Sequence, residues 1–239
     1  MKRVVAIGLG ALVASIAAAQ LAPSGDPAKP VVGKAAPPVP NEKTSASGIR
    51  EALAIGTENA VRSLSRVDGY LGNQAVRIAL PPNIRKLADV ARKAGLQQPV
   101  DDFVLRMNRA AEAAAPLAAR HFGDAIRTMS LEDARGILLG GDTAATDFFR
   151  RKTRERLYAE FKPIVSQKVG EAGATRAYKD LIARFESMPM IGLQPLDLDD
   201  YVSNKALDGL YHMVAQEEKK IRSNPLARTT DLLRAVFGR

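Results

Sequence analysis

The sequence predicts an all-α fold, an irregular single-domain bundle of six to eight helices. Apolar residues recur every three or four positions through most of the chain after residue 48, which is the spacing of one helix face. Glycine and proline residues separate these stretches, as is typical of helix ends. The alternating pattern of a β-strand is nearly absent, so we expect at most one short hairpin or extended loop near residues 68–82.

The N-terminal stretch differs from the rest in composition. Residues 1–19 start with two cations, continue with an apolar run and end in small residues, which is the pattern of a cleaved secretory signal peptide. Residues 20–47 are rich in Pro and Ala and poor in large apolar side chains, which predicts a disordered linker. The helical domain then covers 48–239. We expect a periplasmic or secreted protein, with a retained N-terminal anchor as the alternative.

Composition limits the chemistry and the partners. The chain has no cysteine, which excludes disulfides, thiolate catalysis and Cys-bound metals. Its formal net charge is +9, and removal of Lys2 and Arg3 with the signal peptide leaves +7. Anionic lipid or an acidic protein surface of the envelope is therefore a possible partner, and simple solubility is the alternative reason for a basic surface. Nucleic acid is discounted, because basic motifs interleaved with aromatics are missing.

The first half of the domain contains four helical stretches, separated by turns or helix-breaking residues. A helix is predicted over 49–64, followed by turns at Asp68-Gly69 and Gly72-Asn73 and a short strand or extended loop over 76–80. Pro81-Pro82 starts the next helix, which ends at Gly95. A long helix over 100–129 should kink or break near Pro116. Ser130 and Asp133 have the spacing of a capping box, which opens a short helix ending at Gly140-Gly141.

The second half starts with the central helix, whose pattern runs from Gly140 to about Lys168 with a bend expected at Pro163. Another helical pattern follows, and then a loop over 189–195. Asp197, Asp199 and Asp200 suit the start of a long helix that Asn224-Pro225 breaks. Calcium binding by these three aspartates is disfavoured, because the Gly and Glu of a calcium loop are missing. A final short helix should be capped by Thr229 or Thr230.

Polar residues lie inside the apolar face of the central helix. Asp142, Thr146 and Thr153 share that face with Phe149 and Leu157. Since a buried unpaired polar group costs about 1–3 kcal/mol, we expect Asp142 or Thr146, together with Thr153, to be buried and bonded to a neighbouring helix. The expected donors are Arg106, Asn108, Arg109 or Arg150.

Two other ionisable residues fall on apolar faces. Glu218 lies on the face of the last long helix, with Arg222 one turn further on. An ion pair with Arg222 or Arg150 would be structural, whereas a cavity shared with Asp142 and His121 would make an acid/base or metal site possible. His121 is more often a hydrogen-bonded core residue than a ligand at such a position. We assign no catalytic residue, metal ligand or cofactor.

Two further motifs have ordinary explanations. Residues 136–143, GILLGGDT, have the spacing of a phosphate-binding loop, but Asp142 stands where Lys is required and a helix precedes it. A cationic band on the central helix is by default a solvated helix face, and its functional interpretation is a docking surface for anionic lipid or an acidic partner. The band consists of Arg150, Arg151, Lys152, Arg154 and Arg156.

Several long motifs resemble a bacterial family catalogued as domain of unknown function 4197. In chain order they are IREALAIGTENAV, DGYLGN, FVLRMNRAAE, GILLGGDTAATDFFRRKT, LYAEFKPIV, LDLDDYVSNKALDGL, EEKKIRSNP and ARTTDLL. The resemblance spans about residues 48–238 and implies an exported, mostly helical domain without an established activity, cofactor or catalytic residue to carry over.

Three functional hypotheses therefore stand. The leading one is a non-enzymatic binding or interaction module of the envelope. The second is a carrier of an apolar ligand such as a lipid, because kinked helices with polar groups in their apolar faces can leave a cavity. The third is a hydrolase or metalloenzyme using Asp142, Glu218 and His121, although no nucleophile motif accompanies them.

Overall fold

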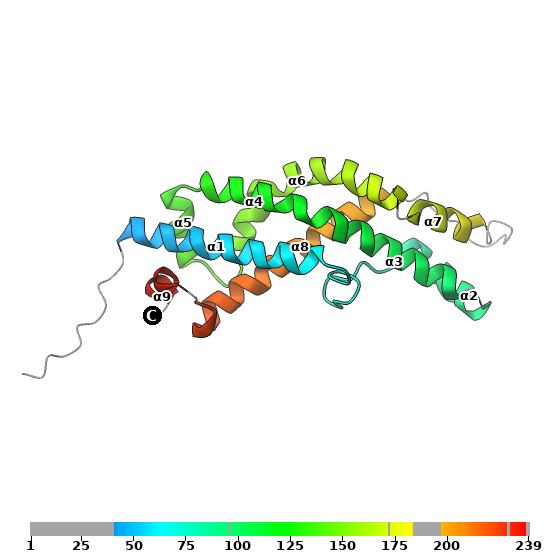
Figure 1. The fold of residues 1–239 in the computed structure, drawn as a ribbon, viewed down its shortest axis with the longest axis horizontal. Helices are drawn as coiled ribbons and strands as arrows, with labels where there is room; N and C mark the ends of the chain where they lie inside the picture. Colours follow the sequence, from blue (N-terminus) through cyan, green and yellow to red (C-terminus); the bar gives the residue numbers. More distant parts are fainter. Residues whose placement is uncertain (1–40, 96, 172, 184–196, 229, 238–239) are drawn as a thin grey trace, which may run out of the picture. The chain divides into compact units, whose positions relative to one another are not determined.

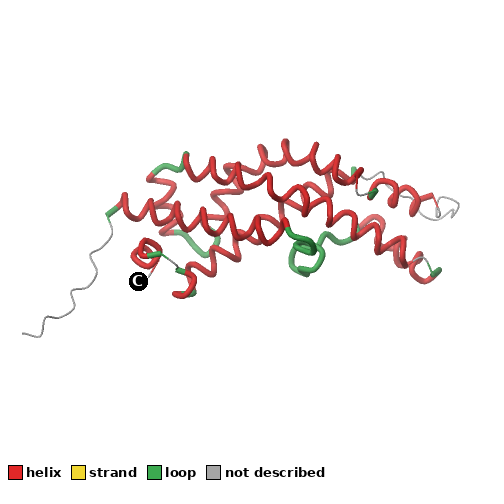
Figure 2. The backbone as a smooth tube through the Cα atoms, in the orientation of Figure 1, coloured by secondary structure: helices red, strands yellow, loops and turns green. Residues whose placement is uncertain are grey.

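A computed structural model describes residues 41–95, 97–171, 173–183, 197–228 and 230–237. Regular structure in these ranges is helical only (Figures 1 and 2), which confirms the all-α prediction. The helices are α1 (Glu42–Ser65), α2 (Pro82–Lys93), α3 (Gln97–Ala114), η1 (Ala115–Leu117), α4 (Ala118–Arg127), α5 (Leu131–Leu139), α6 (Ala144–Glu171), α7 (Ala174–Ala183), α8 (Leu198–Ser223), η2 (Pro225–Ala227) and α9 (Asp231–Phe237). Within the described ranges, no helix is both long and apolar enough to cross a bilayer.

The start of the domain lies earlier than the sequence pattern indicated. Asn41 caps α1 by accepting a hydrogen bond of 2.8 Å from the backbone N–H of Thr44, so residues 42–47 are helical and not linker. Ala46 is buried and extends the apolar face of α1 by one turn, which offsets the entropy of ordering these residues. The predicted signal peptide, the linker up to residue 40 and the loop over 189–195 lie outside the described residues.

Helix ends follow the predicted signals closely. The predicted break near Pro116 is a 3₁₀ turn, η1, between α3 and α4. Ser130 and Asp133 form the expected capping box at the start of α5, which ends before Gly140. α6 continues through Pro163 without a break. Thr230 caps α9 through a hydrogen bond of 3.2 Å from the Leu233 N–H.

The long helices α1, α6 and α8 organise the packing. α1 packs against α3, α4, α5, α8 and α9, and α6 packs along α8 and α3. Aromatic side chains fill the space between α4, α6 and α8, where the ring of Phe122 lies 5.1 Å from that of Phe149 and 6.1 Å from that of Tyr211. Such offset and edge contacts are favourable beyond the apolar area they bury. The candidate site lies where α5 and α6 meet α8.

Candidate functional site

The carboxylate of Glu218 is buried at the N-terminus of another helix. Glu218, on α8, is 7% exposed and accepts hydrogen bonds of 3.0 Å from the backbone N–H of Ala145 and 2.9 Å from that of Thr146. The Thr146 hydroxyl donates a third bond of 2.9 Å. The first amides of a helix have no partner within the helix and carry partial positive charge. Glu218 therefore caps α6 from outside it.

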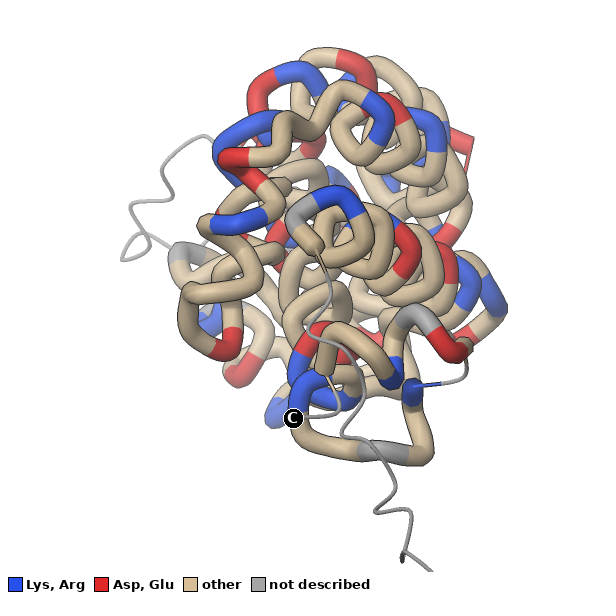
Figure 3. The backbone as a smooth tube through the Cα atoms, turned by 90° about the vertical axis from the view of Figure 1, so that its left-hand side faces the viewer, with Lys and Arg blue, Asp and Glu red and all other residues tan. Residues whose placement is uncertain are grey.

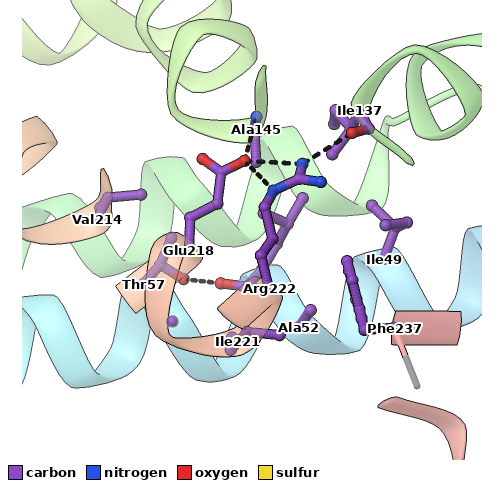
Figure 4. Close-up of a pocket in the computed structure, with 12 residues that line it drawn as sticks. Ile49, Ala52, Thr57, Ile137, Ala145, Val214, Glu218, Ile221, Arg222 and Phe237 are labelled. Atoms are coloured by element: carbon purple, nitrogen blue, oxygen red, sulfur yellow. Dashed lines mark hydrogen bonds and ion pairs between the residues drawn. The ribbon is translucent and has the colours of Figure 1, made fainter. Parts of the chain in front are cut away.

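Arg222 completes the junction from the next turn of α8. Its Nε and Nη2 donate to Glu218 Oε1 at 3.0 and 2.9 Å, and Nη2 also donates to the carbonyl of Ile137 at 2.8 Å (Figure 4). Ile137 lies in the last turn of α5, where carbonyls lack helical partners. One ion pair thus holds the end of α5 and the start of α6 onto α8. The predicted Glu218–Arg222 pair is present and has a structural role.

A narrow apolar pocket lies beside this pair (Figure 4). Its cavity volume is about 20 Å³. A space of that size takes about one water molecule and no lipid chain. The pocket is lined by Ile49, Ala52, Leu53, Gly56, Thr57, Ile137, Ala145, Val214, Glu218, Ile221, Arg222 and Phe237.

The polar residues of the central helix are buried as predicted at two positions. Thr146 and Thr153 are 3% and 4% exposed. Thr153 lies 2.8 Å from the Tyr211 hydroxyl and donates 2.7 Å to the Phe149 carbonyl. Their partners are on α8, so the expectation of donors from Arg106, Asn108, Arg109 or Arg150 was wrong. Thr146 and Thr153 therefore bond across to Glu218 and Tyr211 of α8.

Asp142 and Arg150 do not belong to the buried network. Asp142 is exposed, because α6 begins at Ala144 and residues 141–143 form the turn before it. Helical phase therefore does not apply to Asp142, and the prediction that placed it on the apolar face was wrong. Arg150 is exposed and lies over the ring of Tyr211, 5.0 Å from its centroid.

Asn108 holds the loop between α1 and α2. Its side chain accepts a hydrogen bond of 2.9 Å from the Ile78 N–H and donates one of 2.9 Å to the Ile78 carbonyl. A neighbouring β-strand would pair with the same two backbone groups. It also donates 2.8 Å to the Val104 carbonyl. Of the two structures predicted for 76–80, a short strand or an extended loop, the chain forms the extended loop, and a side chain of α3 satisfies the backbone polar groups of Ile78.

Sequence reasoning missed Glu112, one turn after Asn108. This carboxylate is 4% exposed and accepts from the backbone N–H groups of Tyr70 and Leu71 at 3.1 and 3.2 Å. Arg109 neutralises it at 2.6 Å. The signal was available, because residues 108 and 112 share one helix face with buried alanines.

His121 belongs to a different cluster from Glu218. It is 6% exposed, and its Nε2 lies 2.8 Å from Glu160. It is thus a hydrogen-bonded core residue, as predicted. Glu218 has its own partners and Asp142 is exposed, so the three residues do not converge on one site. In the part of the chain that the structure describes, no group of three or more His, Asp or Glu side chains could hold a metal ion.

A polar ladder joins α6 to the start of α8. Lys162 pairs with Asp197 at 2.9 Å, and the Ser166 hydroxyl donates 2.6 Å to Asp199. Tyr158 donates to Asp200. Asp197 also caps α8, accepting 2.8 Å from the Asp200 N–H. The capping role of this acidic segment is therefore confirmed.

Comparison with known families identifies a match that spans the helices of the structure. The family model described as "Protein of unknown function (DUF4197)" matches residues 40–238. The chain belongs to the DUF4197 family. The match starts beside Asn41, the cap of α1, and not at residue 48. No curated protein and no solved structure matches the DUF4197 chain.

The junction explains two of the motifs quoted above for the DUF4197 chain. GILLGGDTAATDFFRRKT contains Ile137, Ala145 and Thr146, while EEKKIRSNP contains Glu218 and Arg222. Each segment supplies half of the same set of hydrogen bonds.

Stability of the DUF4197 domain should fall in acid. Hydrogen bonds from the Asp200 N–H and Lys162 hold the pKa of Asp197 below its ordinary 3.8, and those from His121 and Arg120 hold the pKa of Glu160 below 4.5. Folded pKa values below the unfolded ones give stability that is present above the unfolded pKa and lost as pH falls through the folded pKa. The free energy of unfolding, measured in urea between about pH 7 and pH 3, should begin to fall near pH 5.

Asp197→Asn removes one of these titrating carboxylates. The free energy of unfolding of this variant should therefore fall less steeply with falling pH than that of the unsubstituted chain. The variant Asp231→Asn is the matched control, because Asp231 is fully exposed and its ion pair among the described residues is with Arg234 one turn away. Equal slopes for the unsubstituted chain and Asp197→Asn would contradict the linkage.

Proposed function

We propose that this chain is an exported, non-enzymatic helical module that acts by binding a partner at its surface. The observation that carries the proposal is that the buried polar side chains are engaged in bonds within the fold. Glu218, Glu112, Asn108 and Thr153 all bond to other helices or to the loop between α1 and α2. A catalytic acid, base or nucleophile must instead have a face turned to its substrate. The signal-peptide pattern of residues 1–19 supports export.

The exposed side of α6 is the surface that we assign to the partner. Arg150 and Arg154 turn toward Asp208 of α8, at 4.0 and 3.0 Å. Arg151, Lys152 and Arg156 are exposed and form no ion pair with another described residue. Figure 3 shows acidic and basic residues interspersed along the backbone. Exposed cations on one helix suit a surface of anionic lipid headgroups, each contributing about 1 kcal/mol near such a surface.

Vesicle sedimentation tests this assignment. The full chain should bind vesicles rich in phosphatidylglycerol and not vesicles of phosphatidylcholine alone. Replacing Arg151, Lys152 and Arg156 by Gln should weaken binding by about tenfold or more. The control replaces Arg85, Lys86 and Lys93, three exposed cations of α2, by Gln and makes the same change in net charge.

If the two triple variants lost vesicle binding equally, net charge alone would explain the binding. That result would contradict a binding site on α6. Failure to bind anionic vesicles, with retained binding to an acidic protein surface, would replace lipid by protein as the partner.

A carrier of an apolar ligand is the second candidate, favoured by the apolar lining of the pocket beside Glu218. Since the space holds about one water molecule, uptake of a lipid would need α9 to move, because Phe237 forms part of the wall.

A further inference from the structure

The C-terminal helix α9 is held by apolar contacts with α1 and α8. Leu233 is fully buried in a small cluster with Ala52 of α1 and Ile221 of α8, while Val236 is buried in the main core and Phe237 packs against both. A helix of seven residues is not stable alone in water, so α9 depends on the groove that it occupies.

Release of α9 would leave the junction of α5, α6 and α8 intact. Glu218 and Arg222 bond to the backbone of α5 and α6, and among the described side chains of α9 Arg222 contacts the Phe237 ring, 5.9 Å from its centroid. What release would uncover is a row of apolar side chains from α1 and α8. The row includes Ile49, Ala52 and Ile221, and Phe237 would no longer cover it (Figure 4).

The segment between α8 and α9 must extend for α9 to leave. In the closed chain its Arg228 donates to the carbonyls of Ile221 and Arg222 at 3.1 and 2.8 Å, and these carbonyls at the end of α8 would then bond to water. Residues 224–230 separate α8 from α9. Seven residues span about 23 Å when extended, which is enough to carry α9 from its own groove to that of an adjacent molecule.

We propose that the groove between α1 and α8 is an interaction surface for α9 of a second copy of this chain, so that two copies exchange their C-terminal helices. The second copy is the occupant whose fit is known, because its Leu233, Val236 and Phe237 would repeat the contacts made within one chain. Asp231 and Arg234 pair within α9, so the helix carries no net side-chain charge into the groove. Reciprocal exchange gives a closed two-fold dimer.

Concentration governs this exchange. A short tether holds α9 at an effective concentration of the order of millimolar, so monomer should dominate at about 10 μM and dimer should become appreciable toward 1 mM. Sedimentation velocity of the full chain over this range of protein concentration measures the mass of the species present and provides the test. Leu233→Asp should abolish the dimer while the main helical melting transition remains. Ala235→Asp, at an exposed position of α9, should leave the dimer unchanged.

Cysteine pairing identifies the exchanged contact, since the chain has no cysteine of its own. Two single variants, Ala52→Cys and Leu233→Cys, are mixed at high concentration and oxidised. Exchange predicts a disulfide-linked heterodimer and no disulfide dimer of Ala52→Cys alone.

Three results would overturn the proposal: monomer at all concentrations, a dimer that persists in Leu233→Asp, or failure of the cysteine pair to link where a dimer is present. Native mass spectrometry adds a fourth, because a monomer carrying a lipid mass would assign the groove to a ligand.

Discussion

Substituting Glu218 by Ala is expected to lower the free energy of unfolding by about 3–5 kcal/mol, as for other buried ion pairs that lose one partner. The change leaves the Arg222 guanidinium buried without its counter-charge and leaves the first amides of α6 without an acceptor. Equilibrium unfolding in urea measures the effect. Replacing both partners, Glu218→Gln with Arg222→Met, should recover part of the loss because no unpaired charge remains.

Asp142→Ala is the matched control at the same junction. It also removes a carboxylate, but an exposed one, and should change stability by less than about 0.5 kcal/mol. If Glu218→Ala were as mild as Asp142→Ala, the buried carboxylate would not be the cap of α6.

Substituting Asn108 by Ala should cost about 2–6 kcal/mol, because the N–H and the carbonyl of Ile78 would both lose their partner, at about 1–3 kcal/mol each. Hydrogen exchange gives a local measurement. The amide of Ile78 should lose protection before the amides in the middle of α3 do.

Gln98→Ala, at an exposed position of the same helix, should leave both stability and exchange nearly unchanged. Retained protection of the Ile78 amide in Asn108→Ala would show that another group holds the loop.

Local rules predicted what depends on neighbours along the chain. The Glu218–Arg222 pair follows from a separation of four residues on a helix, and the start of α5 follows from the Ser130 capping box. The burial of Thr146 and Thr153 follows from helical phase with Phe149. These predictions needed no knowledge of which helices meet.

The errors have two physical sources. Asp142 was misplaced because helical phase was extended backward from the start of α6 at Ala144 into the preceding turn, where side-chain direction no longer follows 100° per residue. The partners of α6 were misassigned because the rotation of one helix against another is set by packing of the whole core, which a periodic pattern does not specify. The same reason explains the division of the cationic band, two of whose members turn to Asp208.

The cap that α8 provides for α6 also constrains when the protein can fold. The residues that bond at this junction lie 72, 73 and 85 positions apart, and Tyr70 donates to the carbonyl of Ala206, 136 positions away. A ribosome releases the chain from its N-terminus, so the start of α6 lacks its acceptor until almost the entire polypeptide has been made. Closing such long loops is slow compared with forming local helices. We therefore expect the nascent chain to lack this junction until its synthesis is almost complete.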